Sequence, residues 1–396
     1  MLGGRGGHGR VRPHLDRWNT VVPALVAVAG RFRRPVSSMH AIAPDDVVAT
    51  FAEAARNARA PLLVTEPLTA FLDAHRLGEG ELDIAPVGEG HSNVTYVIAR
   101  GDERFVLRRP PRPPLPPSAH DVLREARVLR ATAGRARVPA VLATCADESV
   151  IGAPFYVMEL VEGRVITSEV PPELDTPAER RRIGEELIDA LVEVHAVDWQ
   201  ACGLEGFGKP TGYLERQLRR FGGLWEHNKT REIPQVETVG AWLREHLPEQ
   251  QTATIVHGDF RLGNTMFAPA APARLVAIFD WEMATIGDPL ADVGYLTTLW
   301  TEPSEPPLGM FELSAVTRAE GFPLRDELIA RYEERSGRST GDIRWYRTLA
   351  VWKSIVFMEG NYKRAITGAT DDPYLRGFGE GVIELARRAE EMALGA

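Results

Sequence analysis

The 396-residue sequence lacks the features that would place it among several common classes of protein. It has two cysteines, Cys145 and Cys202, too few for a disulfide framework, which indicates a reducing compartment. No apolar run reaches the roughly 18 residues that a transmembrane helix needs. The net charge of -9 leaves no surplus of Lys and Arg for binding phosphate backbones. We therefore expect a globular, cytoplasmic protein that binds neither nucleic acid nor membrane.

The N-terminal segment differs from the rest of the chain in its charge. Residues 1–42 carry seven arginines against one aspartate and show no usable hydrophobic periodicity. The short apolar stretch 21–29 is broken by Pro23, so we do not interpret it as a secretory signal. We expect residues 1–42 to be a basic, disordered extension. Residues 1–38 are consistent with an extended start, because the next methionine is Met39.

The remainder divides into a strand-rich part and a helical part. Three β-patterns separated by turn residues predict an antiparallel meander: Ile84–Val87, Val94–Ile98 and Arg104–Arg108. Ser118, followed by Asp121, predicts the start of a helix, and Phe155–Leu160 reads as a further strand. Beyond it, helical patterns dominate, with a capping box at residues 176–179. We predict an α+β, bilobal fold with an antiparallel-sheet N-lobe at residues 43–161 and a larger, mostly helical C-lobe at residues 162–396.

Two apolar strands in the second half each deliver polar residues into a turn. The first precedes the His-Gly-Asp motif at 257–259 and Asn264, and the second precedes the Asp-Trp-Glu motif at 280–282. Phosphoryl transfer needs a carboxylate to orient the attacking hydroxyl and oxygen ligands to hold Mg²⁺ against the nucleotide phosphates. Asp259 fits the first requirement, while Asn264 and Asp280 fit the second because Mg²⁺ prefers hard oxygen donors.

The pattern His-Gly-Asp-x-x-x-x-Asn, followed by an apolar strand that ends in Asp, resembles the aminoglycoside phosphotransferase and choline kinase group. These are relatives of the protein kinases, and the resemblance implies their two-lobed fold. It also implies that Asp259 is the catalytic base and that Asn264 and Asp280 are the metal ligands. The downstream run 287–294 is similar to the family as well, and there we expect Asp292 to support the loop structurally.

The resemblance also implies where ATP is bound. The Gly-rich turn at 88–93 resembles the phosphate-covering loop, and from it we take Gly88, Gly90, Ser92 and Asn93 as nucleotide contacts. Glu125 falls on the helix where kinases keep a glutamate that pairs with the ATP-binding lysine. The strand that enters the hinge would offer the backbone groups of Glu159 to Val161 to adenine.

One departure from the family pattern concerns the nucleotide phosphates. The third strand should present a lysine there, yet no lysine precedes Lys209. Period-two alternation places Val106 and Arg108 on one face, so Val106 would cover adenine and Arg108 would reach the phosphates. Arginine differs from lysine in size and hydrogen-bonding geometry. Arginine here resembles the branch that contains the kinase-like domains of acyl-CoA dehydrogenase family proteins.

The sequence thus predicts an ATP- and Mg²⁺-dependent kinase that phosphorylates a hydroxyl of a small molecule. The acceptors left open are an aminoglycoside, an amino alcohol, a sugar and a hydroxyacyl-CoA. The alternative is a nucleotide-binding regulatory protein of the same fold with impaired catalysis, which the missing lysine favours and the complete set of Asp259, Asn264 and Asp280 disfavours. We interpret His257 as a structural hydrogen-bonding residue.

Overall fold

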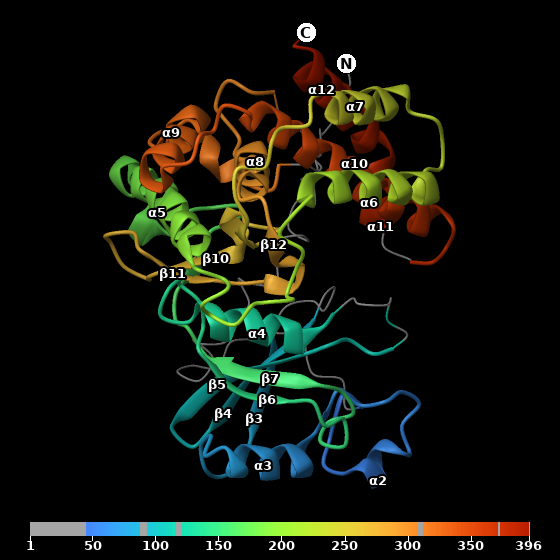
Figure 1. Ribbon diagram of the computed structural model, residues 1–396. Helices are drawn as coiled ribbons and strands as arrows, with labels where there is room; N and C mark the ends of the chain where they lie inside the picture. The colour runs from blue at the N-terminus through green and yellow to red at the C-terminus, as the bar shows by residue number, and fades with distance from the viewer. Residues whose placement is uncertain are drawn as a thin grey trace, which may run out of the picture.

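The computed structural model describes residues 45–87, 93–113, 115, 120–306, 312–370 and 373–395. It has two lobes of unequal size, as Figure 1 shows, with the sheet-containing lobe below and the helical lobe above. The predicted α+β, bilobal architecture is confirmed. Within the described ranges, no helix is long and apolar enough to cross a membrane.

The N-lobe is built on an antiparallel sheet of five strands in the order β3-β4-β5-β7-β6. Their bounds are β3 Asp83–Val87, β4 Val94–Arg100, β5 Glu103–Arg109, β6 Val141–Cys145 and β7 Phe155–Glu159. The predicted meander is therefore confirmed. A two-stranded parallel pair, β1 Val47–Val48 and β2 Leu63–Val64, and the short helix α2 Phe51–Ala54 precede the sheet.

The two faces of this sheet pack against different partners, because successive side chains of a strand point to opposite faces. On β5, Phe105 and Leu107 belong to the hydrophobic core between the sheet and helix α3 (Thr65–Ala74). Val106 belongs to the core that continues into the C-lobe. Helix α4 (Val122–Thr132) covers that second face (Figure 1). Its N-cap is Asp121, which accepts a hydrogen bond from the Arg124 N–H at 3.0 Å. The prediction that Ser118 caps this helix falls on a residue outside the described ranges.

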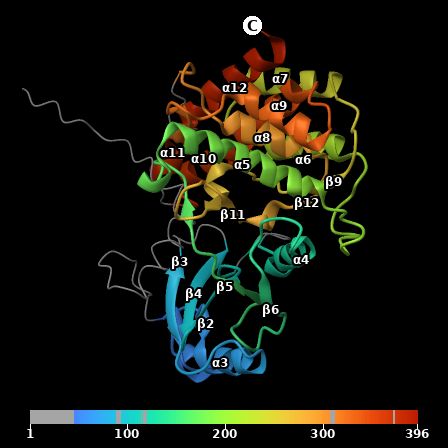
Figure 2. The same cartoon turned by 90° about the vertical axis from the view of Figure 1, so that its left-hand side faces the viewer.

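Helices make up most of the C-lobe (Figure 2). They are α5 Pro177–Ala196, α6 Tyr213–Asn228, α7 Pro234–Glu245, α8 Leu290–Leu299, α9 Arg325–Ser336, α10 Ile343–Ile366, α11 Pro373–Arg376 and α12 Phe378–Leu394. Thr176 caps α5 by accepting from the Glu179 N–H, which is one half of the predicted capping box, whereas the Glu179 carboxylate accepts from the Ala273 N–H instead. Four tryptophans are buried here: Trp281, Trp300, Trp345 and Trp352.

Two small sheets at the junction of the lobes carry the loops with the chemical motifs. Strand β10 (Thr265–Phe267) lies between β8 (Arg164–Val165) and β11 (Leu275–Ile278), and β9 (Thr254–Val256) pairs with β12 (Thr285–Gly287). All these pairs are antiparallel. Because β10 and β11 are antiparallel, Asn264 before β10 and Asp280 after β11 lie at the same end of their sheet.

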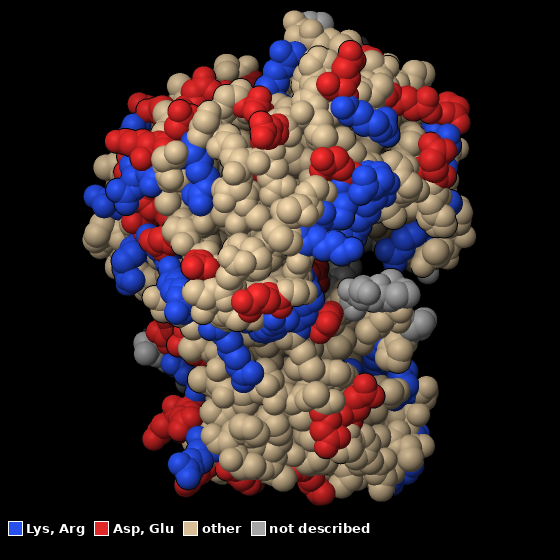
Figure 3. All heavy atoms as spheres, viewed as in Figure 1, with Lys and Arg blue, Asp and Glu red and all other residues tan. Residues whose placement is uncertain are grey.

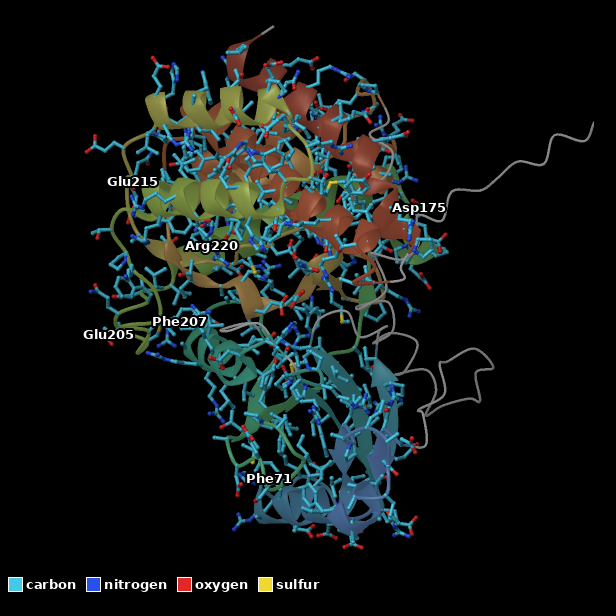
Figure 4. All side chains as sticks on the ribbon, turned by 90° about the vertical axis from the view of Figure 1, so that its right-hand side faces the viewer. Phe71, Asp175, Glu205, Phe207, Glu215 and Arg220 are labelled. Atoms are coloured by element: carbon cyan, nitrogen blue, oxygen red, sulfur yellow. The ribbon has the colours of Figure 1, made fainter. Side chains whose placement is uncertain are left out.

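Helix α4 is tied to the C-lobe by two arginines. Arg124 donates to the Phe207 carbonyl at 2.8 Å, and its guanidinium lies 3.8 Å from the centre of the Phe207 ring. Arg127 donates to the carbonyls of Gly203 and Glu205, each at 2.8 Å. In Figure 4, Glu205 and Phe207 lie on the part of the C-lobe that reaches down to α4. These contacts fix the position of α4, and hence of Glu125, relative to the catalytic loops.

Candidate active site

The His-Gly-Asp motif begins where β9 ends, and its histidine is a structural residue. His257 Nε2 lies 2.9 Å from the Phe279 carbonyl, and Nδ1 lies 3.2 Å from the Asp259 backbone nitrogen. An N–H donor on one side and a carbonyl acceptor on the other require the neutral ring with its proton on Nε2. His257 thus links the residue before Asp280 to Asp259, which confirms its predicted hydrogen-bonding role.

Asp292 on α8 fixes the backbone of the same loop. Its carboxylate accepts from the His257 N–H at 2.7 Å and the Gly258 N–H at 2.8 Å, and lies 3.3 Å from His195 Nε2. Burial alone would raise its pKa, but the hydrogen bond and charge of His195 and the Gly258 N–H hold the pKa of Asp292 below its ordinary value. The predicted structural role of Asp292 is confirmed. Gly258 itself has φ 87°, and a Cβ there would lie 2.9 Å from Met283 atoms.

Asp259 stands where this loop meets a cavity in the C-lobe. Its Oδ2 accepts a hydrogen bond from Asn264 Nδ2 at 2.7 Å, and its Oδ1 lies 3.7 Å from Arg261 Nε. Tyr295 on α8 lines the same cavity, and burial and then the nearby Asp259 carboxylate raise the pKa of its phenol well above the ordinary value. The carboxylate is therefore oriented by its neighbours while it borders open space, which is what a residue that orients a hydroxyl requires.

Asn264 and Asp280 meet beside Asp259 because Asn264 directly precedes β10 and Asp280 follows β11, and these two strands pair antiparallel in one sheet. Asn264 Nδ2 also donates to the Asp259 carbonyl at 2.9 Å, which turns Oδ1 of the amide away from these partners. Asp280 follows β11 with φ 66° and ψ 58°, a left-handed conformation that aspartate tolerates better than most residues. Its Oδ1 lies 2.7 Å from Arg108 Nη2. Within the described ranges, no donor is hydrogen-bonded to Asn264 Oδ1 or Asp280 Oδ2.

These two free oxygens are suited to a Mg²⁺ ion. Mg²⁺ is bound by one or two protein oxygens, with phosphate and water oxygens completing its octahedron. The described residues contain no group of three or more His, Cys, Asp or Glu side chains that could hold a metal alone. The charges agree with this, because Glu125, Asp280 and Glu282 all act on the single guanidinium of Arg108 and leave an excess of negative charge.

Arg108 on β5 is a buried residue that contacts both lobes. Its Nε donates to Glu125 Oε2 at 2.9 Å while its Nη2 reaches Asp280. Asn93 Nδ2 contacts the same Glu125 oxygen at 3.4 Å. Burial raises the pKa of Glu125 to about 7, against the opposing charge of Arg108. Arg108 thus pairs with the glutamate of α4 as a lysine would in a kinase, and its forked guanidinium pairs with Asp280 as well.

The other predicted nucleotide residues are distributed around Arg108. Val106 is buried on the same face of β5, facing the core shared by the lobes. Glu159 ends β7, and it both donates to and accepts from the backbone of Ala140. Half-buried Val161 follows in the connection to the C-lobe. Gly88, Gly90 and Ser92 lie outside the described residues, whereas Asn93 is buried and its Oδ1 has no hydrogen-bond partner among those residues.

The sequence motifs did not reveal the cavity that Asp259 borders. It has a volume of about 310 Å³ and is lined mainly by side chains from α8, α10 and the two helices that follow α10. The lining includes Leu299, Leu349, Phe357, Met358, Tyr374 and Phe378. The volume lies within the range of small-molecule sites. Its lining residues are separated by long stretches of sequence, so only the packed helices bring them together.

Comparison with known proteins identifies the family to which these features belong. A model described as the phosphotransferase enzyme family matches residues 83–337, which include the larger part of each lobe's sheet and helix arrangement up to α9 and every motif above. The chain belongs to this family. Curated relatives of this chain include acyl-CoA dehydrogenase family member 10 of Mus musculus, 36% identical over 79% of the chain, and member 11 of Homo sapiens, 33% identical over 78%. The chain spans only 29% and 41% of those two relatives.

Solved structures show the same fold. A Ralstonia eutropha protein assigned to the aminoglycoside phosphotransferases is 33% identical, with a TM-score of 0.74, and the match covers 84% of this chain and 98% of that protein. A thermostable mutant of an aminoglycoside phosphotransferase, in complex with AMP-PNP and hygromycin B, is 17% identical with a TM-score of 0.52. That match covers 81% and 99% of the two chains and, at this identity, shows the fold alone. The expected kinase-like phosphotransferase fold is thereby confirmed.

Proposed function

We propose that the protein transfers the γ-phosphoryl group of ATP to a hydroxyl of a small molecule in the C-lobe cavity, with Asp259 as the base. The observation that carries the proposal is the position of Asp259, which borders the cavity on one side and contacts Asn264 on the other. The acceptor and the nucleotide phosphates would then meet at Asp259, where in-line transfer requires them to meet.

Each residue around this point has a definable role. Arg108 would bind the phosphates from the N-lobe. The face of β5 that carries Val106 would contact adenine, and the backbone groups after β7 would form hydrogen bonds with the edge of the adenine ring. Asn264 Oδ1 and Asp280 Oδ2 would hold Mg²⁺, which, when bound, neutralises the charge that develops on the phosphoryl oxygens. Arg261, two residues after Asp259, adds a cation beside the reacting group.

The transfer itself needs little covalent chemistry from the protein. Asp259 accepts a hydrogen bond from the acceptor hydroxyl and receives its proton as the oxygen attacks the γ-phosphorus. The bond between that phosphorus and the bridging oxygen breaks, and ADP leaves with the electron pair. Arg261 near Oδ1 and Asn264 on Oδ2 keep the carboxylate in the orientation that this proton transfer requires.

The acceptor panel for the test comprises aminoglycosides, amino alcohols, sugars and hydroxyacyl-CoAs, of which the apolar cavity favours acceptors with an aliphatic body. Transfer from radiolabelled ATP would be measured with and without Mg²⁺ for the wild type and Asp259→Asn. We expect Mg²⁺-dependent transfer that falls about 10²- to 10⁴-fold in the variant. Asp102→Asn, in the exposed turn between β4 and β5, is the control and should behave as the wild type. Nucleotide binding without transfer to any acceptor would instead support the regulatory alternative.

A further inference from the structure

A second pocket lies on the solvent-facing side of helix α4, and we call it the α4 pocket. Its volume is about 380 Å³, and it shares no described lining residue with the cavity beside Asp259. Side chains of α4 and the end of β6 form its N-lobe wall, and the loop at residues 202–203 forms its C-lobe wall. A ligand in the α4 pocket would therefore contact both lobes without entering the active site.

Two arginines of α4 line this pocket and carry charge that is not matched within the protein. Arg127 and Arg130 are three residues apart, so they are neighbours on the helix surface. Arg127 donates through Nη2 to the carbonyls of Gly203 and Glu205 at 2.8 Å, and Arg130 donates through Nη1 to the Thr144 hydroxyl at 3.1 Å. Among the described residues, neither guanidinium forms an ion pair. The two forks are thus held in place by neutral acceptors and keep N–H donors for a further partner.

The surroundings of the two arginines contain little negative charge. Among the described residues that line the α4 pocket there is no carboxylate. Burial raises the pKa of the Cys202 thiol, so this lining residue is neutral at ordinary pH. The carboxylates that act on the thiol, Asp198 and Glu205, lie outside the lining, and Arg135 adds a further cation nearby. Figure 3 shows Lys and Arg side chains at the height of α4, just below the junction of the lobes. Such a concentration of positive charge attracts anions.

The donors in the α4 pocket suit a phosphate group better than a carboxylate. Each guanidinium can donate to two oxygens at once, and the Thr144 hydroxyl has a proton to donate while it accepts from Arg130. A phosphate monoester offers three terminal oxygens to these donors, whereas a carboxylate offers two. Leu123, Ala131 and Ala146 add an apolar wall that can contact a short organic body.

The position of the α4 pocket connects it to Arg108 across the helix. Glu125 lies on the same helix as the two arginines and accepts from Arg108 Nε at 2.9 Å. The α4 pocket has walls from both lobes, so a ligand that contacts α4, β6 and the loop at 202–203 stabilises the arrangement in which they meet. In that arrangement Glu125 reaches Arg108.

We propose that the α4 pocket is a second ligand site, which binds the phosphate group of a small molecule through Arg127 and Arg130 and holds α4 where Glu125 contacts Arg108. The inference goes beyond the proposed phosphoryl transfer, because the bound phosphate group takes part in no covalent step. Inorganic phosphate and a phosphate monoester share the chemistry that the arginines recognise, and the experiment separates them.

Binding to the full chain is measured by calorimetry, without turnover. The probes are propyl phosphate, inorganic phosphate, butyrate and propanol, and propyl phosphate has no alcohol group that could be phosphorylated. Propyl phosphate should bind about tenfold more tightly than butyrate, and propanol should not bind. Tighter binding of propyl phosphate than of inorganic phosphate would identify an ester as the ligand, and the reverse order would identify free phosphate. Butyrate that binds as tightly as both phosphates would overturn the inference.

Variants locate the bound phosphate group. Arg130→Gln should weaken the binding of propyl phosphate about 10- to 100-fold, and Thr144→Val about 2- to 10-fold. Arg130 is exposed and contacts Thr144 alone among the described side chains, so the variant should fold, which thermal unfolding checks. Arg182→Gln is the matched control, because Arg182 is an exposed arginine of α5 outside the lining. Unchanged affinity in Arg130→Gln, or an equal loss in Arg261→Gln at the active site, would also refute the proposal.

Hydrogen exchange tests the effect of the ligand on α4. Propyl phosphate should slow exchange at the amides of residues 122–132 and 198–207 in the wild type and have no such effect in Arg130→Gln. Unchanged exchange in the wild type at saturating propyl phosphate would show that the ligand does not hold α4. Binding of AMP-PNP is measured separately, so a failure of the proposed kinase activity is distinguishable from a failure of this inference.

Discussion

Arg108 Nη2 and Asp280 Oδ1 lie 2.7 Å apart, an ion pair between residues separated by 172 positions. It joins β5 of the N-lobe to the loop that follows β11 in the C-lobe. The same guanidinium holds Glu125 through Nε at 2.9 Å. Arg108 therefore connects the sheet, helix α4 and the proposed metal-binding loop, and the binding of a nucleotide must be compatible with these contacts.

Replacing Arg108 should separate its role in binding ATP from its role in stability. Arg108→Lys keeps the charge but loses the fork that reaches two carboxylates, so we expect the KM for ATP to rise about tenfold, as for a loss of about 1.4 kcal/mol. Arg108→Met should raise KM further and destabilise the fold by at most about 3–5 kcal/mol, because Glu125 remains buried without its partner. This loss of stability is reduced because the pKa of Glu125 is about 7, so the buried carboxylate can take up a proton. Steady-state kinetics and urea unfolding measure the two effects.

The neighbouring arginine supplies the control. Arg109 points to the opposite face of β5, where it donates to the carbonyls of Leu62, Ile151 and Pro110. Arg109→Lys should reduce stability and leave the KM for ATP unchanged. If both substitutions altered the KM for ATP equally, Arg108 would have no specific role in nucleotide binding.

The residues that carry short motifs could be predicted from the sequence, and the reason is geometric. Asp259 and Asp280 each follow a short strand and Asn264 directly precedes one, so the distance along the chain nearly determines their position in space. Arg108 could be placed as well, because the alternation along β5 assigns it to a face. Glu125 was identified by its position after the third strand, since its helix alone would suggest a residue facing solvent.

The acceptor cavity could not be predicted in the same way. Lys353 lies in a long helical pattern in which a charged residue normally marks the solvent side. It lines a cavity only because α6, α8 and α10 pack around it. Likewise, the ion pair between Arg108 and Asp280 depends on the relative position of the two lobes. Local sequence patterns contain no information on the distances between helices or between lobes, so the acceptor site could be identified only from the structure.

Asp292 should control the stability of the catalytic loop rather than the chemistry. Asp292→Ala leaves two backbone N–H groups and His195 without an acceptor in a buried place, and we expect a loss of about 3–5 kcal/mol in the free energy of unfolding. Hydrogen exchange at the His257 and Gly258 amides should also accelerate. Asp189→Ala, which breaks a more accessible pair with Arg331, should cost less than about 1 kcal/mol.

The pH dependence of unfolding tests the same contact. Because the pKa of Asp292 is lowered in the folded protein, its contribution is complete above the unfolded pKa of about 3.9 and is lost as the pH falls through the folded pKa. Asp292→Asn should therefore flatten the acid limb of the stability profile. An unchanged acid limb in this variant, measured by denaturant titration across the pH range, would show that the Asp292 contacts do not contribute to acid stability.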